Sequence, residues 1–140
     1  MIPEYFETHF LLERPVENWP DEFAIITAFA PTGTQWTDEQ NQIADQELEA
    51  ELNRRSLWKH RLTGYSPVTG HAEPGWAVAT DFESACDIGQ CWQQDAIYFV
   101  WLDKLSVSHC DHRRRPVHVG GFRERLHLRM DEQRSDELPT

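Results

Sequence analysis

The chain has 140 residues, of which 39% are hydrophobic, a composition that suits one domain with its own core and excludes wholesale disorder. Its net charge of −11 is concentrated in residues 1–103, where 18 acidic side chains stand against 5 basic ones; such an acidic body makes nucleic-acid binding unfavourable. No apolar stretch reaches the roughly 20 residues of a membrane helix, and the N-terminus lacks the basic region of a signal peptide, so we expect no membrane association.

The cysteines point to a reducing compartment. Cys86, Cys91 and Cys110 are odd in number and lack the spacing of a zinc framework. We therefore expect a cytoplasmic protein without structural disulfides, metal or cofactor. Cys86 and Cys91 are expected to be small buried hydrophobic residues.

The predicted elements begin with a strand over residues 5–14, where Phe6, Phe10 and Leu12 alternate with Glu7 and His9 until the pattern fades at Leu11. A proline-bracketed loop follows it. Residues 23–30, "FAIITAFA", are apolar on both of the faces that alternate along a strand, which is typical of a central strand buried on both sides.

A helix is predicted to start at Thr37, because Thr37 and Gln40 have the spacing of a capping box. Its inward stripe consists of residues at intervals of three or four: Asn41, Ala44, Leu48 and Leu52. Two strands follow, at 57–66 and 75–80. A second capping pattern, Thr80 with Glu83, then predicts a second helix, and residues 96–102, "AIYFVWL", form the most apolar strand.

This order predicts an α+β fold: a ferredoxin-like βαββαβ sandwich with an extra N-terminal strand on an antiparallel sheet. We expect the N-terminal strand to cover the edge of strand 96–102. The predicted domain spans residues 1–110, and residues 111–140 are expected to be a C-terminal arm, partly ordered or flexible. The sheet face opposite the helices needs cover from that arm or from a homodimer or other protein partner, since a large exposed apolar face is unfavourable.

Three segments together resemble an uncharacterised group of small bacterial proteins, domain-of-unknown-function family 3293: "FAIITAFAPTG…WTDEQNQIADQELEAEL", "HAEPGWAV" and "QDAIYF". The resemblance covers about residues 5 to 102. Ile26, Thr27 and Ala28 match the family's first strand, whereas Ala30 precedes Pro31 where the family commonly has Asn. The resemblance implies the same fold order and a cytosolic setting, and it brings no established activity.

The turn after the first central strand is the leading candidate site. It has a single glycine, Gly33, and no lysine, and acidic residues occupy the following helix start, so phosphate binding is disfavoured. A neutral or cationic small molecule suits it better, with Thr27, Thr32 and Asn41 as candidate ligand-binding residues. The alternative for Asn41 is that its side chain fixes the loop over Pro31.

Two further candidates come from other segments. If the strands containing residues 23–30 and 75–80 are antiparallel neighbours, Glu73 approaches this turn and can act as a general base or bind an amine. Gln94, just before the last strand, is the fifth candidate. The alternatives are a surface carboxylate for Glu73 and backbone hydrogen bonding at a helix end for Gln94.

Two motifs near the C-terminus carry weaker signals. "HCDH", residues 109–112, contains metal-type ligands, but three arginines follow directly and oppose a divalent ion, so no metal site is expected. Arg113–Arg115 are expected to form a solvated arm or to fold over the acidic helix face.

Three functional hypotheses result. The first is a binding or regulatory domain for a small molecule or a protein partner, which we expect rather than an enzyme because no complete catalytic constellation is present. The second is an enzyme that uses Glu73 with Thr27, Thr32 and Asn41 in a pocket. The third is an acidic mimic of nucleic acid that inhibits a basic partner.

Overall fold

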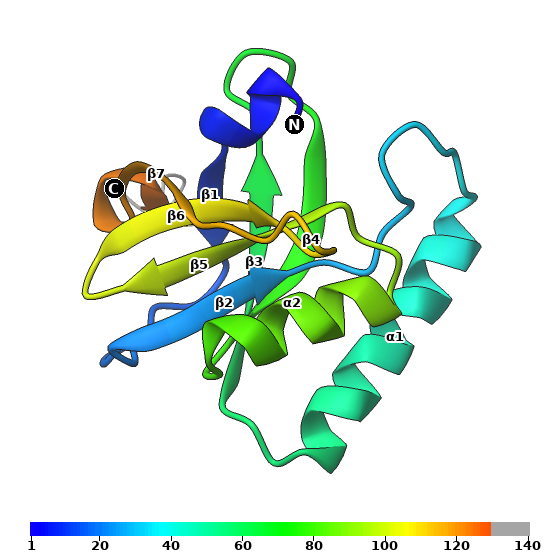
Figure 1. Cartoon of the computed structure of the whole chain (residues 1–140), viewed down its shortest axis with the longest axis horizontal. Helices are drawn as coiled ribbons and strands as arrows, with labels where there is room; N and C mark the ends of the chain where they lie inside the picture. The colour runs from blue at the N-terminus through cyan, green and yellow to red at the C-terminus, as the bar shows by residue number, and fades with distance from the viewer. Residues whose placement is uncertain (130–140) are drawn as a thin grey trace, which may run out of the picture.

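The computed structural model describes residues 1–129, which form two helices and one curled sheet of eight strands (Figure 1). The order across the sheet is β7-β6-β5-β2-β4-β3-β1-β8, and all neighbours pair antiparallel apart from β1 and β8, which are parallel. The α+β class is therefore confirmed. The helices are α1 (Asp38–Arg54) and α2 (Phe82–Cys91), and the strands are β1 (His9–Leu12), β2 (Glu22–Ile26), β3 (Lys59–Tyr65), β4 (Ala72–Val78), β5 (Ala96–Trp101), β6 (Lys104–His109), β7 (Val117–Gly121) and β8 (Leu126–Leu128).

The two central strands, β2 and β4, lie side by side and antiparallel, as the sequence predicts. Their alternating side chains define two faces of the sheet. Ile26 and Val78 point toward the helices, on what we call the helix face, whereas Phe23, Ile25 and Ala77 point to the opposite side, which we call the inner face.

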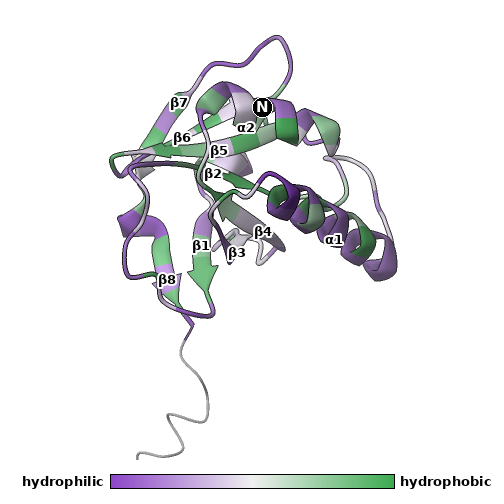
Figure 2. Ribbon diagram, turned by 90° about the horizontal axis from the view of Figure 1, so that it is seen from below, coloured by the Kyte–Doolittle hydropathy of each residue, from purple (hydrophilic) through white to green (hydrophobic). Residues whose placement is uncertain are grey.

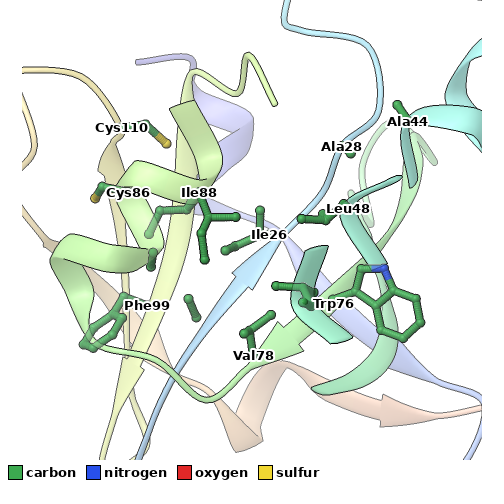
Figure 3. Close-up of a cluster of buried hydrophobic side chains, with 14 residues drawn as sticks. Ile26, Ala28, Ala44, Leu48, Trp76, Val78, Cys86, Ile88, Phe99 and Cys110 are labelled. Atoms are coloured by element: carbon green, nitrogen blue, oxygen red, sulfur yellow. The ribbon is translucent and has the colours of Figure 1, made fainter. Parts of the chain in front are cut away.

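The helix face is covered by α1 and α2, whose buried side chains share one cluster with β2, β4 and β5 (Figure 3). The predicted capping box at α1 is present: Gln40 N donates to Thr37 Oγ1 at 3.1 Å, and Thr37 N donates to Gln40 Oε1 at 2.8 Å. Ala44, Leu48 and Leu52 are buried as predicted.

The cap of α2 differs from the prediction. Its N-cap is Asp81, whose carboxylate accepts a hydrogen bond from Ser84 N at 3.1 Å, and not Thr80. A carboxylate one residue later serves the same helix end, and it also complements the positive end of the helix dipole. Cys86 on α2 is buried as expected, but Cys91 is exposed at the end of the helix, so that part of the prediction is wrong.

The N-terminal segment departs from a strand over residues 5–14. A short 3-10 helix, η1 (Pro3–Phe6), comes first, and β1 is only four residues long. β1 pairs with β3, and not with β5, so the predicted cover for the edge of β5 is wrong. β6 covers that edge through a two-residue turn in which Leu102 and Asp103 both have positive φ, the backbone geometry that tight hairpins require.

The inner face is closed over much of its area by the chain itself. Phe122 is 2% exposed, and its ring centroid lies 5.1 Å from Phe23, 4.9 Å from Trp19 and 5.8 Å from Phe10. These contacts bring the segment after residue 110 onto the sheet, where β7 extends one edge and β8 the other (Figure 2). Within the predicted arm, β7 and β8 are thus part of the sheet, and the domain boundary at residue 110 stays a prediction.

Two polar segments of the sequence have structural roles in this arrangement. Arg114 binds Glu83 and Asp87 on α2 at 2.9 and 3.0 Å, so part of the arginine run folds over the acidic helix face, one of the two arrangements expected. His109 ends β6 and Cys110 is buried beside α2. Within residues 1–129, no group of three or more His, Cys, Asp or Glu side chains is arranged to hold a metal ion.

Candidate functional site: a cavity at one end of the inner face

A cavity of about 700 Å³ lies at the end of the inner face where β2 ends and where β4 and β5 begin. Its walls come from η1, the loop between β2 and α1, the turn between β3 and β4, and the residues just before β5. Figure 1 shows η1 and the β3–β4 turn at this same end of the molecule. All five sequence-predicted candidates line this one cavity: Thr27, Thr32, Asn41, Glu73 and Gln94.

The hollow exists because small residues occupy the inner-facing positions at this end of the sheet. Gly64 and Gly75 lie on the adjacent strands β3 and β4, where Gly75 is opposite Leu62 and Gly64 is opposite Glu73. Thr27 follows β2, and Ala96 begins β5. Large side chains at these positions would fill the space, as they do further along the same face.

The roof of the cavity is η1, and it is fixed from both sides. The Tyr98 hydroxyl on the floor lies 2.8 Å from both Tyr5 O and Thr8 Oγ1, and these two acceptors share its single proton. Tyr5 in turn shares a 2.6 Å hydrogen bond with Thr32 across the mouth, and Arg125 donates to Phe6 O and Thr8 O at 2.8 and 3.2 Å. The loop after β2, strand β5 and the turn before β8 therefore hold a four-residue helix in place.

Three of the predicted candidates shape the cavity through main-chain contacts. Thr27 donates its hydroxyl to Pro74 O at 2.9 Å, which links β2 to β4 beyond their last pair. Asn41 Oδ1 accepts from Ala30 N at 2.9 Å, so the loop-fixing alternative is the observed arrangement. Gln94 donates to Phe29 O and Trp92 O at 2.9 and 3.1 Å, which is the backbone alternative for this residue.

These contacts leave part of each amide side chain uncommitted. Asn41 Nδ2 and Gln94 Oε1 make no hydrogen bond to any atom of residues 1–129, and neither is fully enclosed by protein. Asn41 Nδ2 therefore remains available as a donor and Gln94 Oε1 as an acceptor. Each is held in place by the hydrogen bond that the other amide atom of the same side chain makes. A rigid amide of this kind can orient a polar ligand.

The charged groups at the cavity are mainly acidic. Glu73 is bound to His71 at 2.8 Å, with 30% of its side chain exposed, and Glu4 and Asp38 lie at the exposed rim. His71 is the sole basic side chain among the lining residues. The site thus joins a carboxylate–imidazole pair to an otherwise uncharged interior.

Aromatic residues that no sequence pattern marked as site residues form much of the remaining wall: Tyr5, Phe10, Phe29, Trp36, Tyr65 and Tyr98. Burial raises the pKa of Tyr98, and the charges of Tyr5 and Glu73 add to this effect. Its phenol therefore stays protonated and acts as a hydrogen-bond donor. The alternation Ala96–Tyr98–Val100 could have placed Tyr98 on the same face as Thr27, had the inner face been known.

The buried thiols lie away from this cavity. Burial raises the pKa of Cys86 to about 11 and that of Cys110 to about 12, so both remain protonated near neutral pH. Neither has the microenvironment of an activated nucleophile.

Fold and site together define a small α+β protein with an inner-face cavity roofed by its own N-terminus. Residues 26–97, just over half of the chain, match the family described as Protein of unknown function (DUF3293), and the chain belongs to that family. The matched segment runs from the end of β2 to the start of β5, so it contains all five candidate residues. No curated protein and no solved structure matches the chain. Neither helix in residues 1–129 is long and apolar enough to cross a membrane.

Proposed function

We propose that the protein is a small cytoplasmic binding domain that takes a small molecule into the inner-face cavity. One observation supports the proposal: five polar residues selected from three separate segments of the sequence line the same cavity. Its volume of about 700 Å³ lies within the range of about 300–1,000 Å³ for small-molecule sites, and its walls combine aromatic surface with a few fixed polar groups.

The small molecule is preferred to a protein partner because the inner face offers little flat apolar surface. Phe122 and Trp19 already cover its far half. Three free cysteines support the cytoplasmic location.

We also propose a ferredoxin-like unit, because the central strand order is β5-β2-β4-β3 with two helices on one face. This unit is enlarged by β1, β6, β7 and β8, and a bacterial source remains part of the proposal.

An enzymatic role for the same residues has weaker support. The hydroxyl of Thr27 and the amide oxygen of Asn41 are engaged with main-chain groups, which favours scaffolding over chemistry. The acidic-mimic hypothesis is also weakened, since Glu51, Glu83 and Asp87 are paired with arginines instead of forming a continuous negative row.

The test is a ligand screen read at one tryptophan. Trp36 lines the cavity, whereas Trp101 is 52% exposed at the opposite end of β5. In 15N-labelled protein, a cavity ligand should shift the indole signal of Trp36 and leave that of Trp101 in place. At a concentration of one hundred times its Kd it should stabilise the fold by about 2.7 kcal/mol, a rise in melting temperature of several degrees.

A broad metabolite screen that moves neither the melting temperature nor the Trp36 signal would contradict the proposal. Ligands that move Trp101 and not Trp36 would place binding outside the cavity and contradict it equally.

A further inference from the structure

We infer that the ligand is an organic cation: an ammonium head held by Glu73 beside aromatic rings, carried on an apolar body that lies on the cavity floor. This inference rests on the proposed small-molecule function and specifies its ligand class.

The first support is the charge of the wall. Three carboxylates line the cavity, those of Glu4, Asp38 and Glu73, and the lining residues include neither lysine nor arginine. An anionic ligand would find no permanent positive charge there, and burying its charge unpaired is costly. A cation would meet compensating charge from both the wall and the acidic body.

The second support is the position of Glu73. It lies on the inner face of β4 opposite Gly64, so no side chain on β3 shields it at that position. Its Oε2 binds His71 at 2.8 Å, and its Oε1 makes no hydrogen bond within residues 1–129. A half-exposed carboxylate with one oxygen free is a good acceptor for an N⁺–H donor, because such charge-assisted bonds are stronger than neutral ones.

The third support is the aromatic surface of the same cavity. Tyr5 and Trp36 line it together with Glu73, and ring faces attract cations. The chain already uses this interaction on its helix face, where the Arg61 guanidinium carbon lies 3.8 Å from the centroid of Trp76 while binding Asp45. A carboxylate with an aromatic ring is therefore a cation site that this fold builds elsewhere from its own residues.

The apolar part of the ligand follows from the floor. Phe10, Ile25 and Leu62 line it, and Gly64 and Gly75 leave room above the strands. An aliphatic or aromatic body would bury apolar area there, whereas a compact inorganic cation would leave this surface wet. The geometry thus favours an amine with a hydrophobic body over a metal ion.

The experiment compares three probes of similar shape and different charge: tryptamine, 3-ethylindole and indole-3-propionate. We expect tryptamine to shift the Trp36 indole signal of the labelled protein and to bind at least about tenfold more tightly than 3-ethylindole, with no cavity binding by indole-3-propionate. Glu73→Gln should weaken tryptamine binding about tenfold and leave 3-ethylindole unchanged. Glu22→Gln, an exposed carboxylate at the far end of the sheet, is the matched control and should change neither.

Each result decides between the two claims. Equal binding of tryptamine and 3-ethylindole, preference for the carboxylate probe, or insensitivity to Glu73→Gln overturns the cation inference and leaves small-molecule binding in place. If none of the three probes binds, phenethylamine and putrescine are tested in the same assay; failure of all the amines overturns the inference. The proposed function fails only if the broad metabolite screen is empty as well.

Discussion

The two halves of the inner face differ in side-chain size, although the same strands build both. Along β2, Phe23 packs against Phe122 and Trp19 at one end, whereas Thr27 faces open space at the other. Along β5, Val100 is buried in the packed half and Ala96 begins the hollow one. We call these regions the packed half and the hollow half. Their contrast indicates that the cavity arises because the inner-facing side chains are small there, since the same strands build both halves.

The packed half should be the more sensitive to truncation. Phe122→Ala removes a ring that contacts three other aromatic side chains, and should lower the free energy of unfolding by about 3–5 kcal/mol in chemical denaturation. Phe6→Ala, at a residue that is 37% exposed, is the matched control and should change this free energy by less than about 0.5 kcal/mol. A loss below about 1 kcal/mol for Phe122→Ala would mean that the C-terminal segment does not stabilise the sheet.

In the hollow half, hydrogen bonds should matter more than packing. Thr27→Val keeps the shape of the side chain but leaves Pro74 O without its donor and Phe29 N without its acceptor, at an expected cost of about 1–3 kcal/mol. Thr63→Val on β3 is the control, because the Thr63 hydroxyl makes no hydrogen bond within residues 1–129. Faster hydrogen exchange at the Phe29 amide should accompany the loss, and unchanged exchange there would contradict this account.

The two glycines of the floor should respond with opposite signs. At Gly75 an added Cβ would lie 2.8 Å from Ile26 O, a main-chain atom of β2, so Gly75→Ala should destabilise the fold by about 1–3 kcal/mol. At Gly64 the nearest atoms would be Thr8 Cγ2 at 3.4 Å and a Phe10 ring carbon at 3.7 Å, which are ordinary contacts.

Gly64→Ala should therefore stabilise the fold by about 0.4–1 kcal/mol, because alanine restricts the unfolded chain. The same methyl group takes space on the cavity floor, so ligand affinity should fall while the unfolding midpoint rises. Denaturation and binding titrations on one sample measure both quantities. A Gly64→Ala variant that is less stable than the parent would show that this part of the hollow half is already tightly packed.

The smallest expected effect lies at the edge where β8 joins β1. His9 Nδ1 and His127 Nε2 are 2.9 Å apart, and burial lowers the pKa of His9, with His127 and Arg125 adding to the shift. Because the folded-state pKa lies below the unfolded value of about 6.5, the unfolded chain binds more protons as the pH falls. Stability should be fully present above about pH 6.5 and should decline as the pH drops through that value.

His9→Gln should flatten this decline, whereas His118→Gln on the exposed β7 should not. Unfolding midpoints between pH 7.5 and 5.5, values chosen to span the ordinary histidine range of about 6.5, measure the difference. If the unfolding midpoints of the parent and of the His9→Gln protein change with pH in the same way, the histidine pair does not contribute to the pH dependence of stability.

Sequence patterns predicted the central elements well because their signals are strong. The capping box and three-to-four spacing located α1, and the uniformly apolar residues 23–30 located β2. β6 was missed because its buried Leu105 and Val107 alternate with Ser106 and Ser108, a short period-two signal between turns. β7 and β8 give no strand pattern in the sequence, because β7 ends in two glycines and β8 is only three residues long, and both become strands through pairing with β6 and β1.

The sequence predicts the parts of the candidate site that depend on which strands are neighbours. It does not predict the parts that depend on which face of the sheet a side chain lies on. Antiparallel pairing of β2 and β4 was enough to bring Thr27 and Glu73 to one edge. For Tyr98 the strand is apolar on both sides, so the pattern gives no direction for its hydroxyl. Tyr5 was assigned to a strand, and its place in the roof depends on Tyr98 and on Arg125, which is 120 residues away in the chain.

The guanidinium of Arg125 holds main-chain oxygens of residues 6 and 8 together with Val119 O. During synthesis the segment that covers the cavity is made first, yet this anchor is among the last described residues to leave the ribosome. A nascent chain can therefore assemble the central strands and both helices before the roof of the cavity is anchored. A product that ends before Arg125 would therefore keep the central strands and both helices but lack this anchor of the roof.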